Sequence, residues 1–367
     1  MGGTRFAHLA EAVRIDRAEH DAVSARIIER LAAIGIDARV IPHLRSKVDF
    51  GDIDLLCARS QTHGGIAPDD IDALLAKDGS IAAAVGAIAH ERGQIANPSL
   101  HMLVEGARGP IQVDLVSIED HLLAFAQEHM SWGDVGTMVA VVGRQMGLKI
   151  GMTGLTMTRR HAAEVLRARV ELDWAGTLEM LGFDPAVHAA GFDTRRDTFE
   201  WLAKSRYFDP RIYALERQTN YSRQRALKRP GYMEMLAWIE AEQPTRNYDW
   251  GTERGERTEE HAEAILERFP ETRASLDRQV AERAARRKPA FFNGDVVGAI
   301  TGVKGRELQF IVHAIVKELG MDEIRRMEAA NDHAGLAKVA LRHADAGVGM
   351  LGLRERRRQR WHDPNGA

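Results

Sequence analysis

Two aspartates separated by one residue, at the start of an apolar segment, constrain the fold of this sequence most. The segment reads Gly51-Asp52-Ile53-Asp54-Leu55-Leu56. Alternate side chains of a β-strand share a face, so the pattern predicts a strand with both carboxylates on one side and Ile53 and Leu55 in the core. Neighbouring carboxylates repel each other unless a cation neutralises them. We therefore expect a cation site where this strand begins.

A third aspartate lies inside a second apolar segment, Ile111-Gln112-Val113-Asp114-Leu115-Val116. We expect this segment to form a neighbouring strand. Hard oxygen ligands without thiols or paired histidines favour Mg²⁺ or Mn²⁺. An Asp-x-Asp pattern alone also occurs in turns and on surfaces, so it is the third carboxylate that makes the pattern specific. The predicted metal ligands are Asp52, Asp54 and Asp114.

The composition excludes several classes of protein. A hydrophobic content of 44% with 28% charged residues excludes a wholly disordered chain, and the single cysteine, Cys57, excludes a disulfide framework or a cysteine-rich metal site. The longest apolar stretch, near 81–89, is far shorter than the roughly 20 residues that span a bilayer. The sequence therefore predicts a cytoplasmic protein without a membrane partner.

Hydrophobic spacing predicts an α+β fold, in which a small mixed-sheet domain precedes a mainly α-helical region. The elements expected in the first domain are helices over 19–34 and within 68–89, strands over 38–41 and 53–58, and a hairpin of 100–105 with 111–117. Beyond 151 strand signals become scarce, and we expect helices near 161–170, 198–202, 232–241, 259–268, 273–287, 307–319 and 333–343. The predicted domains are 1–155, 156–245 and 258–367, with a surface loop or linker over 244–257.

The three aspartates and their flanking residues resemble the DNA polymerase beta-like nucleotidyltransferase superfamily. The match consists of Gly51–Leu56 with Val113-Asp114-Leu115, and of Gly143–Ile150 followed by Thr153-Gly154-Leu155, which is similar to the helix and turn that close the catalytic region in the polymerase X branch. It covers roughly residues 20 to 157. One departure concerns nucleotide binding, because Ile41-Pro42 stands where the family has a Gly-Ser turn near the triphosphate.

The resemblance implies a palm-like catalytic domain that transfers a nucleoside monophosphate from an NTP such as ATP to a hydroxyl and releases pyrophosphate. It also implies two Mg²⁺ or Mn²⁺ ions held by the three aspartates, with Asp114 next to the attacking hydroxyl. In place of the missing Gly-Ser turn, Arg45, Ser46 and Lys47 offer two cations and a hydroxyl to phosphate oxygens, and the resemblance implies a nucleotide contact near Trp132. The predicted nucleotide-binding residues are Arg45, Ser46, Lys47, Gly51, Trp132, Gly133 and Asp134. For Trp132, packing at a domain interface is the competing interpretation.

The net charge of −3 argues against a nucleic-acid partner, but the charge is unevenly distributed. Residues 1–150 hold 14 basic and 20 acidic residues, whereas 204–229 hold eight basic and two acidic ones, interleaved with aromatic residues. Such a segment suits phosphate contacts and base stacking, although a solvated helix face has the same composition. The predicted acceptor-binding residues are Arg223, Arg225, Lys228, Arg229 and Lys304.

Lys304 lies in Gly302-Val303-Lys304-Gly305, a turn that resembles the Gly-x-x-Gly turn of helix-hairpin-helix modules and a C-terminal element of bacterial CCA-adding and poly(A) polymerases. Simple helix-helix turn geometry explains the glycines equally well. The first hypothesis is a nucleotidyltransferase acting on a nucleic-acid 3′ end, RNA or tRNA-like. The alternatives are a small-molecule nucleotidyltransferase and a catalytically silent nucleic-acid-binding protein.

Overall fold

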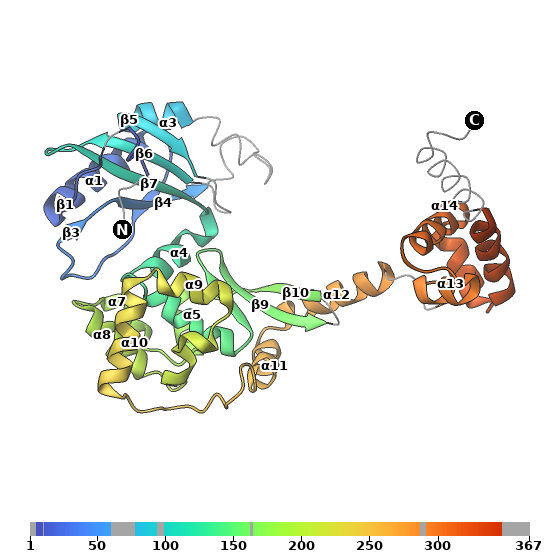
Figure 1. Ribbon diagram of the computed structural model, residues 1–367. Coiled ribbons are helices and arrows are strands. Elements are labelled where there is room, and N and C mark those ends of the chain that lie inside the picture. Colours follow the sequence, from blue (N-terminus) through green and yellow to red (C-terminus); the bar gives the residue numbers. More distant parts are fainter. Residues whose placement is uncertain are drawn as a thin grey trace, which may run out of the picture. The chain divides into compact units, whose positions relative to one another are not determined.

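A five-stranded mixed sheet in the order β2-β4-β7-β6-β5 is the centre of the N-terminal part of the chain (Figure 1). The structure is a computed structural model that describes residues 5–9, 11–59, 78–93, 99–161, 164–286 and 291–346. Within it the chain divides into two compact units, Met1–Asp277 and Arg278–Ala367, which are described separately. The fold class is α+β, as predicted.

The five strands are β2 (Ala38–Val40), β4 (Ile53–Arg59), β5 (Ala87–Arg92), β6 (Ser99–Glu105) and β7 (Pro110–Glu119). β4 and β7 pair in parallel, and the other neighbours pair antiparallel. The predicted hairpin is therefore present as β6 and β7. The prediction of a helix through residue 89 was wrong, because α3 (Asp78–Val85) ends before Gly86, whose φ of 72° breaks the helix, and β5 follows.

The sheet has two apolar faces that different helices cover. Helix α1 (Arg17–Ala33), capped by Asp16, buries Val23, Ile27 and Leu31 in one core with α3 and with Ile53 and Leu55 of β4. Leu56 and Ala58, which point the other way along β4, pack with residues of α4 (Leu123–Met130). The alternation predicted for β4 is therefore present. A two-stranded pairing of β1 (Ile15–Asp16) with β3 (Asp49–Phe50) precedes β4.

A second, three-stranded antiparallel sheet follows the first, in a region where the sequence analysis predicted a helix. It consists of β8 (Leu148–Gly151), β9 (Gly154–His161) and β10 (Glu164–Val170) in the order β10-β9-β8. The predicted helix over 161–170 was wrong, because the pattern there has a period of two rather than 3.6. Leu166, Ala168 and Val170 are buried, and the residues between them are exposed. The region beyond residue 151 therefore begins with β9 and β10 rather than with helices.

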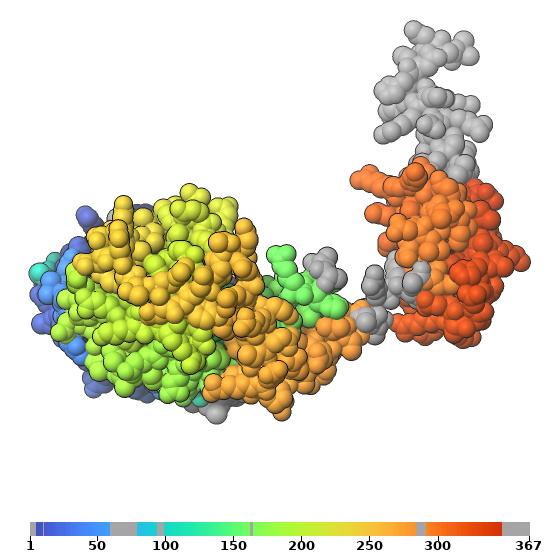
Figure 2. All heavy atoms as spheres, turned by 90° about the horizontal axis from the view of Figure 1, so that it is seen from below, coloured from blue at the N-terminus to red at the C-terminus, as the bar shows by residue number. Residues whose placement is uncertain are grey.

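Helices make up most of the rest of the first unit. They are η2 (Asp120–Leu122), α5 (Val135–Gln145), α6 (Trp174–Met180), α7 (Pro185–Ala190), α8 (Arg195–Ala203), η3 (Pro210–Tyr213), η4 (Leu215–Arg217), α9 (Asn220–Leu227), α10 (Pro230–Glu242) and α11 (Thr258–Arg268). Helix α12 (Pro270–Arg286) begins in the first unit and ends in the second. The helices expected near 198–202, 232–241 and 259–268 are confirmed as α8, α10 and α11. In the space-filling view the yellow-green and yellow residues, which include α8 and α10, cover most of the visible face of the first unit (Figure 2).

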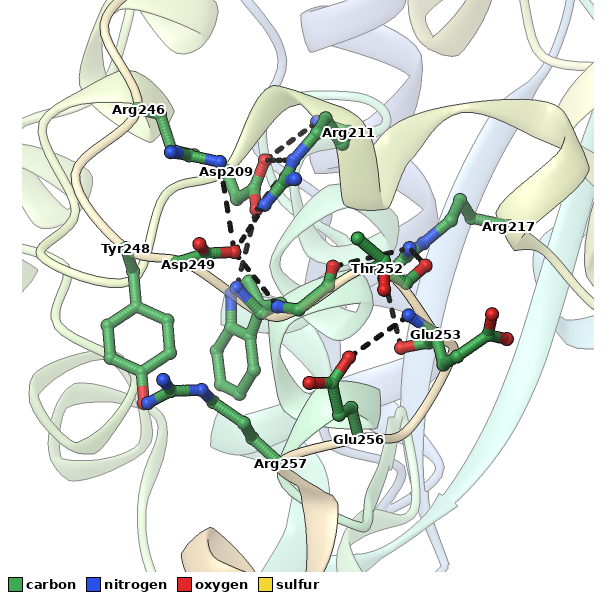
Figure 3. Close-up of polar contacts among 12 residues, drawn as sticks. Asp209, Arg211, Arg217, Arg246, Tyr248, Asp249, Thr252, Glu253, Glu256 and Arg257 are labelled. Carbon is green, nitrogen blue, oxygen red and sulfur yellow. Dashed lines mark hydrogen bonds and ion pairs between the residues drawn. The ribbon is translucent and has the colours of Figure 1, made fainter.

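The segment over 244–257, predicted as a surface loop or linker, contains no helix or strand but is firmly attached (Figure 3). Trp250 is 1% exposed and donates from its indole to the carbonyl oxygen of Tyr207 at 2.9 Å. Asp249 pairs with Arg211, which also pairs with the buried Asp209. The segment is therefore an ordered part of the first unit rather than a loose linker, because an aromatic anchor and ion pairs hold it.

The second unit is helical. It contains α13 (Gly294–Thr301), α14 (Gly305–Ala329) and helical residues 333–346, so the helices expected near 307–319 and 333–343 are confirmed. Its buried core is formed by residues of all three helices and of the segment before α13: Phe292, Val297, Ile315, Ile324 and Leu336. Gly302 ends α13 with a φ of 70°, and Gly320 kinks α14. The three predicted domain ranges stay predictions.

Candidate metal centre

Three carboxylates meet on one face of the central sheet. Asp52 directly precedes β4, Asp54 belongs to β4, and Asp114 belongs to β7. Because β4 and β7 pair in parallel with Asp54 opposite Asp114, the two side chains project from the same face. One oxygen of each aspartate lies within 4.8 Å of the others, and all three residues are half-buried. The structure thus brings together the three residues predicted from the sequence.

The apolar neighbours of the aspartates explain why the carboxylates converge. Ile53 and Val113, which are paired across the two strands, are both 0% exposed in the core under α1 and α3. Burying these side chains fixes the strand register, since a shift by one residue would turn them to the opposite face. The same alternation then holds Asp54 and Asp114 on the face away from this core.

The electrostatics of the cluster favour a bound cation. Burial, followed by the negative charges of Asp52 and Asp114, raises the pKa of the Asp54 carboxyl to about 7, although the charge of Lys47 opposes the shift. Burial, followed by the charge of Asp114, also raises the pKa of Asp52, while Lys47 opposes this shift. Three hard oxygen donors that repel one another fit Mg²⁺ or Mn²⁺, because a divalent cation relieves the repulsion and replaces the lost hydration.

Two further residues contact Asp114, and sequence reasoning did not find them. Gln112 is 4% exposed and donates from Nε2 to both carboxylate oxygens of Asp114, at 3.0 and 3.2 Å. His101 lies opposite Asp114 in the pairing of β6 with β7, and its Nδ1 is 2.8 Å from Oδ1 of Asp114. The two atoms are in close contact, but His101 Nδ1 has no hydrogen-bond partner among the described residues. Strand alternation could have indicated Gln112, which is two residues from Asp114, whereas only the register of β6 against β7 identifies His101.

Among the predicted nucleotide-binding residues, Lys47 interacts electrostatically with two of the aspartates. Its ammonium lies 4.4 Å from the centroid of the buried Phe50 ring, a cation–π contact. Burial lowers the pKa of Lys47, whereas the charges of Asp52 and Asp54 raise it. A half-buried ammonium that is electrostatically coupled to two metal-ligand candidates is placed to contact an anion bound there. Gly51, also predicted, is buried immediately before Asp52.

Arg45 and Ser46 contact the segment before α8 instead. The backbone N–H of Arg45 donates to the carbonyl of Phe192 at 3.1 Å, and that of Ser46 donates to the carbonyl of Asp193 at 2.9 Å. The Arg45 guanidinium pairs with the Asp193 carboxylate at 2.7 Å and donates to the carbonyl of Ala190. These two predicted nucleotide-binding residues therefore join the sheet to the helical part of the first unit, and the guanidinium already has a carboxylate partner.

Trp132, Gly133 and Asp134 form a turn whose side chains also contact the helical part. Trp132 has a φ of 63° and packs its ring edge-on against Phe192, with ring centroids 6.1 Å apart. A Cβ on Gly191 would lie 2.5 Å from this indole, so glycine is needed there for close packing. These contacts favour the alternative interpretation of Trp132 as a packing residue over base stacking. Gly133 is exposed and has a φ of 77°.

The predicted acceptor-binding arginines lie on and after α9. Arg223, Arg225 and Lys228 are exposed, and Arg225 lies 5.6 Å above the ring of Tyr221, which is 71% exposed. Arg229 instead pairs with Asp134 at 2.5 Å, so one predicted acceptor residue and one predicted nucleotide residue contact each other. Lys304 belongs to the second unit, where it precedes the first residue of α14.

Comparisons with known proteins add little. No protein-family model matches the chain, and no curated protein does. Among solved structures, it is similar to Leishmania infantum polymerase beta in a ternary P/T complex, at 13% identity, and in a ternary gap complex, at 12%. Both similarities have a TM-score of 0.34 and cover 40% of this chain, but only 59% and 52% of those chains, respectively. Likeness at this level does not establish a shared function.

None of the helices in the described part of the chain is both long enough and apolar enough to span a membrane.

Proposed function

We propose that this chain is a metal-dependent nucleotidyltransferase, which transfers a nucleoside monophosphate from an NTP to a hydroxyl acceptor and releases pyrophosphate. The observation that carries the proposal is the convergence of Asp52, Asp54 and Asp114 on one face of two parallel strands, with one oxygen of each within 4.8 Å of the others. The resemblance of these residues and their neighbours to the polymerase beta-like superfamily supports the same reaction.

Asp52, Asp54 and Asp114 would hold Mg²⁺ or Mn²⁺ in the proposed enzyme. A divalent cation bound by them supplies Lewis acidity, which activates a hydroxyl and neutralises charge on the triphosphate. The resemblance implies two such ions, and the three carboxylates would supply oxygen ligands to hold them. Phosphoryl transfer depends mainly on positioning and charge neutralisation, so the reaction requires no nucleophilic side chain.

The chain's own residues would orient the reactants and move the proton. Asp114 is held by Gln112 and His101, which fix its carboxylate before a substrate arrives. In the proposed step the acceptor oxygen forms a bond to the α-phosphorus, the bond to the pyrophosphate oxygen breaks, and the carboxylate of Asp114 accepts the hydroxyl proton. Lys47, coupled to Asp52 and Asp54, would donate to an oxygen of the triphosphate.

The acceptor that we propose is the 3′ end of a nucleic acid, RNA or tRNA-like. Support comes from α9, where Arg223, Arg225 and Lys228 are exposed next to the exposed ring of Tyr221. Cations bind the phosphodiester backbone, and an exposed ring offers a stacking surface for a base. Arg229 would join them only by exchanging Asp134 for a phosphate, since the two side chains are paired.

The test is incubation of the full chain with Mg²⁺, each labelled NTP in turn, and either bulk tRNA or short oligonucleotides. Extension of the nucleic acid supports the proposal, while pyrophosphate release only with a small hydroxylated acceptor supports the small-molecule alternative. Binding of nucleic acid without turnover under any of these conditions would leave the catalytically silent alternative standing. The matched inactive control is Asp54→Asn, which preserves the size of the side chain.

A further inference from the structure

Arg144 of α5 carries a positive charge that the described part of the protein does not balance. The residue is half-buried, and its Nη2 donates to Oε1 of Gln218 at 2.9 Å. Among the described residues no carboxylate forms an ion pair with it, and a side-chain amide cannot neutralise a charge. A guanidinium does not release its proton at neutral pH, so the charge persists in a partly desolvated place.

Two more arginines increase the charge around Arg144. Burial lowers the pKa of the Arg144 guanidinium, and repulsion from Arg254 and from Arg225 lowers it further, although the phenol of Tyr232 opposes this. Arg225 belongs to α9 and Arg254 to the 244–257 segment, and both are exposed. In the part of the chain that the structure describes, neither of them pairs with a carboxylate. Arg144, Arg225 and Arg254 therefore influence one another electrostatically, and none of them has a carboxylate partner in the described part of the chain.

A buried hydroxyl without a partner lies in the same place. Tyr213 is 0% exposed, and its phenol oxygen has no hydrogen-bond partner, although buried polar groups are nearly always paired. Tyr213 directly follows Ile212, whose carbonyl accepts a hydrogen bond from Gln218, and Gln218 accepts one from Arg144, so Tyr213 and Arg144 belong to one network. The Nε of Arg217 is also buried without a partner. Unpaired donors next to unbalanced cations indicate an acceptor that the chain itself does not provide.

Two consecutive residues hold the cluster in place. Arg217 donates from its guanidinium to the carbonyl oxygens of Gly251, Thr252 and Glu253, which fixes the backbone that carries Arg254 (Figure 3). Gln218, which follows it, accepts from Arg144 and donates to the carbonyl of Ile212 at 2.7 Å. Arg144 and Arg254 are therefore positioned by the same short segment, so their proximity is part of the fold.

We infer that Arg144, Arg225 and Arg254 form a binding site for a phosphate group, with the hydroxyl of Tyr213 as a further donor. Phosphate fits because its oxygens accept hydrogen bonds from several guanidinium groups at once and its charge compensates the buried cation. The phosphate belongs either to a nucleoside triphosphate or to a nucleic-acid strand. Binding itself does not depend on the proposed nucleotidyl transfer, whereas a role of the site in recognising the substrate rests on that function.

Titration of the full chain with inorganic phosphate, without divalent metal and at constant ionic strength, tests the inference by calorimetry. We expect Arg144→Met and Arg254→Met to weaken phosphate binding about tenfold or more, since each removes charge-assisted hydrogen bonds. The matched control is Arg196→Met, because exposed Arg196 already pairs with Glu200 and Glu242. Equal affinity in wild type and Arg254→Met, or no binding to wild type, overturns the site. Arg254 is exposed, so this variant tests the site even if Arg144→Met fails to fold.

Two further titrations identify the source of the phosphate. If the site belongs to a nucleic-acid strand, Arg254→Met weakens binding of a short oligonucleotide and reduces its salt slope by about one charge. If it belongs to the nucleotide, the same variant weakens binding of ATP instead. Because neither titration involves turnover, failure of the proposed catalytic function leaves these results unaffected. Unchanged affinity for both ligands contradicts the inference.

Discussion

Asp54 of β4 and Asp114 of β7 lie directly opposite each other in a parallel strand pair, with Asp52 two residues before Asp54. A sheet gains nothing from facing carboxylates, since like charges opposite each other destabilise strand pairing. The protein keeps this arrangement although burial and mutual repulsion raise the pKa of Asp54 to about 7. A bound divalent cation would offset this cost, because it neutralises the facing carboxylates.

Replacing Asp54 by Asn should abolish nucleotidyl transfer and leave the fold intact. The amide preserves the size of the side chain but removes a charged metal ligand, and loss of a charge-stabilising group at such a centre costs about 10²- to 10³-fold or more in rate. Pyrophosphate release measures the effect, and circular dichroism checks the fold. The matched control is Asp120→Asn, an exposed residue of η2. Unaltered turnover in Asp54→Asn would remove the basis for the metal assignment.

Ionisation of Asp54 should lower the stability of the metal-free protein as pH rises from about 4 to about 7. The pKa of Asp54 is higher in the folded state, at about 7, than its ordinary value of 3.8, so folding binds a proton that is lost over this range. The difference corresponds to about 4 kcal/mol of stability. Urea unfolding of wild type and of Asp54→Asn, at pH 5 and pH 8, isolates this contribution.

Mg²⁺ should reverse that loss at pH 8 in the wild type but not in Asp54→Asn. A ligand that binds only the folded state stabilises it in proportion to the logarithm of its concentration over its dissociation constant. The variant should show no change of midpoint with Mg²⁺ beyond that given by the same ionic strength of NaCl. A wild-type protein that Mg²⁺ and Mn²⁺ do not stabilise would contradict a metal role for the three aspartates.

His101→Phe and Gln112→Leu should weaken metal binding without removing a ligand. Both residues touch Asp114, and groups that orient metal ligands contribute about 10- to 100-fold to metal affinity. Titration with Mn²⁺, followed by electron paramagnetic resonance, measures the affinity directly. His90→Phe on the neighbouring strand β5 is the control, since His90 is exposed. A decrease in thermal stability with unchanged Mn²⁺ affinity would show that the two residues serve only the sheet.

The sequence predicted the face that carries the three aspartates well, because that face depends on local alternation. Asp52 and Asp54 stand two residues apart at the start of an apolar segment, and Asp114 stands alone inside another, so the two strands and the shared face of Asp52 and Asp54 follow from spacing alone. The contact of His101 with Asp114 does not, because it depends on which residues pair across strands, whereas Gln112 is two residues from Asp114 on β7 and so shares its face. No local pattern encodes the register of β6 against β7.

Two strands were misinterpreted for a related reason. Residues of β10 such as Glu164, Leu166 and Arg167 favour helices by intrinsic propensity, and the pairing with β9 overrides it. In β5 the run of alanines continues from α3, so nothing but Gly86 marks the change. Arg144 was likewise invisible as a candidate phosphate ligand, since the absence of a counter-ion becomes apparent only in three dimensions.

Replacing Arg223, Arg225 and Lys228 by Gln should weaken nucleic-acid binding in a salt-dependent manner. Each exposed cation that contacts a phosphate releases a counter-ion, so the slope of log affinity against log salt concentration should fall by about two to three, with little effect on stability. Fluorescence anisotropy with a labelled oligonucleotide at several salt concentrations measures both quantities. The matched control replaces Arg195 and Arg196 of α8, which pair with Glu234 and Glu200, by Gln. If the triple variant keeps the wild-type affinity and slope, the basic residues of α9 are solvated surface, and the acceptor must be sought among small molecules.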